Sequence, residues 1–71
     1  MVETHLTFRT IDFIDTFLDG LERLAPNRYM YSHLDALDAF NELLLVRASG
    51  EAARLRRRIA RVRDEVSEAL L

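Results

Sequence analysis

The sequence contains no cysteine and no tryptophan, and its 71 residues include only one proline and two glycines. Without cysteine the chain can form neither a disulfide nor a cysteine-based zinc site. The longest apolar run, residues 43–46, is far shorter than the roughly 20 residues that a membrane-spanning helix needs. A chain of this length buries only roughly 60% of its unfolded surface. We therefore expect one small domain that gains stability by associating with further copies of itself.

Lysine is also absent, so all ten basic residues are arginine, and the charge is uneven along the chain. Residues 1–49 contain eight acidic residues and four arginines, a net charge of −4, whereas residues 50–71 contain four acidic residues and six arginines, a net charge of +2. With 49% apolar and 31% charged residues, the composition is that of a folded domain. No basic segment followed by an apolar one begins the sequence, which predicts no secretory signal and a cytoplasmic protein.

Residues 3–10 alternate polar and apolar side chains with the period of a β-strand. Leu6 and Phe8 would lie on one side of this strand, and His5, Thr7 and Arg9 on the other. A lone strand leaves its backbone groups unpaired, and no second strand is apparent in the chain. We therefore expect the strand to pair with its counterpart in a second copy.

A helix is predicted from Ile11 to the stop at Pro26, with Thr10 as its N-cap. Its apolar side chains fill one arc: Ile11, Phe13, Ile14, Phe17, Leu18, Leu21, Leu24 and Ala25. An acidic stripe of Asp12, Asp15, Asp19 and Glu22 lies outside this arc. We interpret the stripe as a solvated face, partly neutralised by arginines near the end of the chain, with cation or basic-partner binding as the alternative.

A second helix is predicted to begin between Asn27 and His33. Ser32 followed by Asp35 resembles a capping box, and Asn27 is a competing cap. The predicted apolar face consists of Met30, Leu34, Leu37, Phe40, Leu44, Leu45 and Ala48, with Asn41 close to its middle.

Ser49 and Gly50 predict a break before a third helix. Leu55, Ile59, Val62 and Val66 then repeat with heptad spacing, which is typical of a coiled-coil seam between chains but also fits packing inside a small bundle. Arginines flank this seam: Arg54, Arg57, Arg58 and Arg61 on one side, Arg56 and Arg63 on the other. We expect residues 1–48 to form one unit and residues 49–71 to form an oligomerisation helix.

The sequence offers little for catalysis. His5 and His33 are far apart, and the neighbours Ser32 and His33 would point in different directions on a helix. No paired-histidine spacing supplies a metal site, and no glycine-rich loop could hold a phosphate. We expect neither an enzyme nor a bound metal or cofactor.

A short alternating strand followed by two helices, over about residues 3–46, resembles the ribbon-helix-helix repressors of the Arc and Mnt type. The resemblance implies a dimer whose paired strands enter the DNA major groove and read bases with His5, Thr7 and Arg9. It also implies that Leu6 and Phe8 turn toward the helices of the dimer. Phosphate contacts would come from Arg28 and Ser32, and the seam after Gly50 would assemble tetramers.

Two functions therefore follow from the sequence. The first is a sequence-specific DNA-binding repressor or antitoxin that acts as a dimer or tetramer on double-stranded DNA. The alternative is a small all-helical protein–protein interaction module, such as an adaptor, inhibitor or assembly subunit. In that alternative the fold is a three-helix bundle, and residues 3–9 extend the first helix or form a loose arm.

Overall fold

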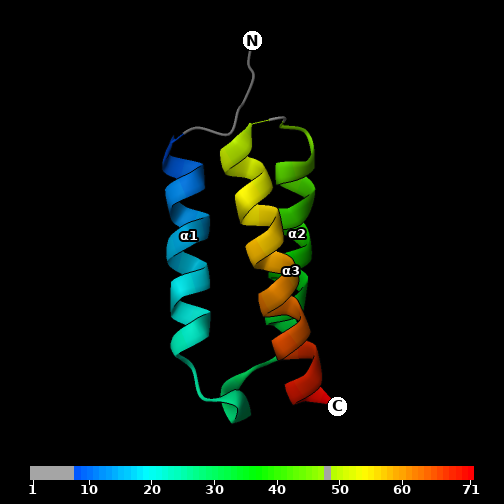
Figure 1. Ribbon diagram of the computed structural model, residues 1–71. Coiled ribbons are helices and arrows are strands. Elements are labelled where there is room, and N and C mark those ends of the chain that lie inside the picture. Colours follow the sequence, from blue (N-terminus) through cyan, green and yellow to red (C-terminus); the bar gives the residue numbers. More distant parts are fainter. Residues whose placement is uncertain (1–7, 48) are drawn as a thin grey trace.

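The computed structural model describes residues 8–47 and 49–71, which form an elongated bundle of 42 × 20 × 17 Å (Figure 1). Its elements are α1 (Phe8–Arg23), the short 3-10 helix η1 (Pro26–Arg28), α2 (Tyr31–Leu45) and α3 (Gly50–Leu70). Consecutive helices run in opposite directions, so α1 and α3 are parallel to each other (Figure 1). Over the described residues the fold is all α-helical, as expected for a three-helix bundle.

The predicted strand over residues 3–10 is wrong where the structure describes it, because Phe8, Arg9 and Thr10 form the first turn of α1. The described residues include no strand with which these three could pair, whereas extending the helix satisfies their backbone groups locally. Residues 3–7, which include His5, Leu6 and Thr7, lie outside the described residues.

The connection between α1 and α2 is fixed by local hydrogen bonds. Pro26 begins η1 after α1 has ended at Arg23, as a proline stop predicts. The Tyr29 hydroxyl then donates to the backbone oxygen of Leu21 at 3.2 Å, a carbonyl in the last turn of α1 that also accepts from the backbone N–H of Leu24 at 3.1 Å. α2 begins within the predicted interval, at Tyr31.

The cap of α2 is neither of the two expected residues. Its N-cap is Met30, whose backbone N–H donates to Nδ1 of His33 at 3.0 Å. Ser32 lies inside the first turn instead. The predicted break before α3 is confirmed, because Ser49 is its N-cap and accepts a hydrogen bond from the backbone N–H of Ala52 at 3.1 Å.

One apolar core joins all three helices. Its buried residues are Ile14, Leu18 and Leu21 of α1, Leu37 and Leu44 of α2, and Ala52, Leu55, Ile59, Val62 and Val66 of α3. The heptad-spaced side chains of α3 are thus buried inside this chain, which corresponds to packing within a small bundle. Leu55, Ile59, Val62 and Val66 therefore present no surface to a partner, contrary to the expected oligomerisation seam.

The expected boundary between residues 48 and 49 falls between α2 and α3, but side chains from both sides of it pack in the same core. Among the described residues, no helix is long and apolar enough to cross a lipid bilayer.

Candidate interaction surface

The structure does not bring the described candidates for DNA contact together. Arg9 is exposed in the first turn of α1, at one end of the bundle. Arg28 and Ser32 are exposed in η1 and the first turn of α2, at the opposite end (Figure 1). Arg9 therefore cannot share one compact contact with Arg28 and Ser32 in a single chain.

An ionic face joins α1 to α3, and Arg58 is its centre. This guanidinium donates to Asp15 at 2.8 Å, to Glu22 at 2.9 Å and to Asp19, and only 16% of the side chain is exposed. Hydrogen bonds to Glu22 and Asp19 raise the pKa of Arg58 above its ordinary value, because they stabilise the charged form. Arg54 also pairs with Asp15, at 3.0 Å. The expected neutralisation of the acidic stripe by the third helix is confirmed.

On its other side, α3 is tied to α2. Arg63 contacts both carboxylate oxygens of Asp38, at 2.8 and 3.4 Å, and this hydrogen bonding raises the pKa of Arg63. Arg56 donates to the backbone oxygen of Leu44 at 3.2 Å, in the last turn of α2. Most arginines of α3 thus hold the bundle together rather than offering a free basic patch.

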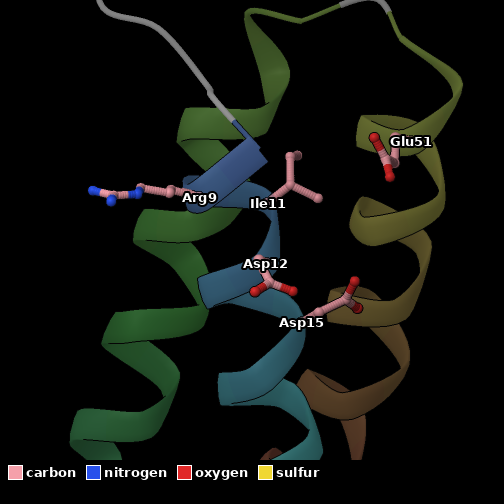
Figure 2. A pocket seen from close by; sticks show the side chains of 5 residues that line it. All are labelled: Arg9, Ile11, Asp12, Asp15 and Glu51. Carbon is pink, nitrogen blue, oxygen red and sulfur yellow. The ribbon is translucent and has the colours of Figure 1, made fainter.

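A shallow hollow of about 260 Å³ lies between the first turns of α1 and α3. It is lined by Arg9, Ile11, Asp12, Asp15 and Glu51. Figure 2 shows Arg9 extending away from the carboxylates and Asp15 turned toward α3. Among the described residues, no group of three or more histidine, cysteine or acidic side chains is placed to hold a metal ion.

The remaining side of the bundle, where α1 and α2 face each other, is apolar. The Phe40 ring of α2 packs edge-on against Phe13 and Phe17 of α1, with centroid distances of 5.8 and 5.2 Å. Phe13 is nevertheless 60% exposed, and Leu43, one turn after Phe40, is 46% exposed. We call this surface the aromatic face and define it by Phe13, Phe17, Leu24, Phe40 and Leu43.

The aromatic face exists because the apolar arc of α1 is wider than the core requires. Ile14, Leu18 and Leu21 fill the core, and the acidic stripe takes the side toward α3. Phe13 and Leu24 occupy the opposite edge of the arc and stay partly exposed. The sequence pattern identified Phe13, Leu24 and Phe40 as apolar-face residues, but it treated them as core.

Leu43 was missed in the sequence because it lies at the edge of the predicted face of α2. The signal that could have found it is the uninterrupted apolar run of residues 43–46, which covers more of the helix circumference than one buried stripe needs.

No family model, curated protein or solved structure matches the chain.

Proposed function

We propose that the protein is a small helical protein–protein interaction module whose contact surface is the aromatic face. The single observation that supports this is the group of exposed apolar side chains around the ring of Phe40, on a chain whose other sides carry paired charges. Isolated exposed apolar residues are ordinary, but a group of them on one side of two packed helices is typical of a protein contact.

The energetics favour a contact at this position. Fully burying a phenylalanine or leucine side chain contributes about 1.5–3 kcal/mol relative to leaving it in water. Phe13 and Leu43 are 60% and 46% exposed, so burying the rest of each side chain in a contact would contribute roughly half of that free energy. Phe40, which also packs against Phe17, holds the Phe13 ring in place beforehand, so little side-chain entropy is lost on binding.

Photo-crosslinking in cells that make the protein tests the proposal. A photoreactive phenylalanine analogue replaces Leu43 on the aromatic face, and the matched control carries it at Ala60, which is exposed on the outer side of α3. We expect covalent adducts of defined mass from position 43 and none from position 60. An absence of adducts at position 43, or equal labelling at both positions, would contradict the proposal.

DNA binding by a ribbon-helix-helix dimer stays a prediction from the sequence. Its base-reading strand is expected over residues 3–10; residues 3–7 lie outside the described part of the chain, and residues 8–10 are helical. The test is an Arg9→Ala variant, which should lose salt-sensitive DNA binding while its melting temperature stays unchanged. A wild-type chain that shows no salt-sensitive DNA binding would rule the prediction out.

A further inference from the structure

The carboxylates of α1 lie away from the aromatic face. Asp15, Asp19 and Glu22 each pair with an arginine of α3. Asp12 comes seven residues before Asp19, about two helical turns, and therefore lies close to the same side of the helix. It lines the hollow between α1 and α3 rather than the contact between α1 and α2.

The carboxylates of α2 also lie away from this face. Asp38 pairs with Arg63 of α3 at 2.8 Å. Asp35 and Glu42 come three residues before and four residues after Asp38, so they share its side of α2. Among the described residues, the aromatic face therefore carries no negative charge.

Two exposed arginines lie at one end of the aromatic face. Arg9 precedes Phe13 by four residues, and Arg47 follows Leu43 by four, so each lies about one turn beyond an exposed apolar side chain. α1 begins and α2 ends at the same end of the bundle (Figure 1). We call this the positive end of the face and define it by Arg9 and Arg47.

The two arginines also lie at nearly the same level. Phe40 contacts both Phe13 and Phe17, which places it about midway between them along the bundle. A rise of about 1.5 Å per residue then puts Arg9 about 9 Å and Arg47 about 10 Å beyond Phe40. One ligand group at this end can therefore approach both arginines.

The charge of Arg9 is not neutralised by its nearest carboxylate on α1. Asp12 follows it by three residues, but no ion pair joins the two within the described part of the chain. Figure 2 shows the Arg9 side chain extending away from Asp12.

We propose that the partner on the aromatic face is an amphipathic helix that carries acidic residues in one terminal turn. This inference rests on the proposed function and names the chemistry of the partner. From Phe13 to Leu24 the face runs about 16 Å along α1, the length of about three helical turns. A helix laid along it buries its apolar stripe against the face and places its acidic turn against Arg9 and Arg47.

A second copy of this chain, docked through the same face, does not have this chemistry. Its aromatic face carries no carboxylate among the described residues and ends in the same two arginines. If the helices were parallel across the contact, the positive ends would meet and repel each other. If they were antiparallel, each positive end would meet the end near Leu24, where the face again has no carboxylate.

Matched synthetic peptides test the inference on purified protein. Each is a fluorescently labelled, stapled helix of about three turns with one leucine stripe, and only its first turn differs, carrying glutamates, glutamines or arginines. Fluorescence anisotropy gives the Kd of each peptide. We expect the glutamate peptide to bind at least about tenfold more tightly than the arginine peptide, because the latter presents like charges to the positive end.

Variants of the protein assign this preference to the face. Arg9→Glu should lower the preference for the glutamate peptide at least about fivefold, and Phe13→Gln should weaken the binding of all three peptides. A glutamate at position 9 lies in the first turn of α1, where the helix dipole favours it, so the variant keeps its fold. The matched control is Arg57→Glu, on the outer side of α3, which should bind all three peptides as the wild type does.

Equal affinity for the glutamate and arginine peptides would overturn the inference, and so would an Arg9→Glu variant that keeps the wild-type preference. Adducts from position 43 in cells, without any preference for the glutamate peptide, would support the proposed function but exclude the acidic helix. An adduct with the mass of two copies of this chain would overturn the inference in favour of a second copy. Absence of both adducts and peptide binding would contradict both proposals.

Discussion

Replacing Arg58 with methionine should destabilise the bundle more than any other single arginine change on α3. The substitution retains the packing of the aliphatic stem but removes hydrogen bonds to Asp15, Asp19 and Glu22. It also leaves three carboxylates close together without their shared cation. Both effects act against the folded state, and both arise from the geometry of the ionic face.

The magnitude follows from the burial of the four groups. An exposed ion pair contributes about 0.2–1 kcal/mol, whereas removing one partner of a buried pair costs about 3–5 kcal/mol. Arg58 is 16% exposed, and its partners are 29%, 54% and 34% exposed, so the network lies between these limits. We expect a loss of about 2 kcal/mol in the free energy of unfolding, and a Tm lower by about 8–16 °C for a domain of this size.

Urea unfolding followed by circular dichroism at one fixed protein concentration measures this loss, and Arg57→Met is the matched control. Arg57 is exposed and forms no ion pair among the described residues, so its replacement should change stability by less than about 0.5 kcal/mol. Equal, small losses of stability for Arg58→Met and Arg57→Met would contradict this prediction.

The pKa of Arg58 is raised in the folded state. Its contribution to the free energy of unfolding is therefore fully present below the ordinary arginine pKa and is lost only as the pH rises through the raised value. The difference between the variants should therefore be constant across the neutral range.

Substitutions at three further positions test two hydrogen bonds and one helix position by the same urea unfolding. Tyr29→Phe removes the donor to the Leu21 carbonyl and should cost about 1 kcal/mol, and an unchanged midpoint would contradict this. Ser49→Ala removes the cap that accepts from Ala52 and should also cost about 1 kcal/mol, whereas Ser49→Asp should retain most of the stability. Gly20→Ala should raise stability by about 0.5–1 kcal/mol, because an added methyl group meets no atom within 4 Å in the middle of α1. A Gly20→Ala variant that is less stable than the wild type would contradict this prediction.

Periodicity predicted the helices well because each buries one stripe. The heptad spacing from Leu55 to Val66 identified the buried residues of α3, and Pro26 and Ser49 marked the ends of elements correctly. The pattern could not tell whether that seam packs within or between chains, because both require the same spacing. Tertiary packing decides this, and it places the seam in the core of a single chain.

The strand prediction failed for Phe8 to Thr10 because short alternating segments carry a weak signal. Three residues next to a strongly amphipathic helix gain backbone hydrogen bonds by joining it, whatever their own alternation. The aromatic face was not predicted as a surface for a related reason. Sequence shows which side chains of α1 and α2 are apolar, but only the packing of α3 determines that Phe13 and Leu43 stay exposed.

Photo-crosslinking from position 43 tests the central claim, contact through the aromatic face, most directly. The compared chains all carry the photoreactive phenylalanine analogue at position 43: one is otherwise wild type, one adds Phe13→Gln on the aromatic face, and one adds Leu71→Gln at a fully exposed position at the end of α3. We expect adducts of the same mass from the first chain and from Leu71→Gln, and much weaker adducts from Phe13→Gln with unchanged helix content. No adducts from the first chain, or adducts from Phe13→Gln as strong as those from Leu71→Gln, would contradict the claim.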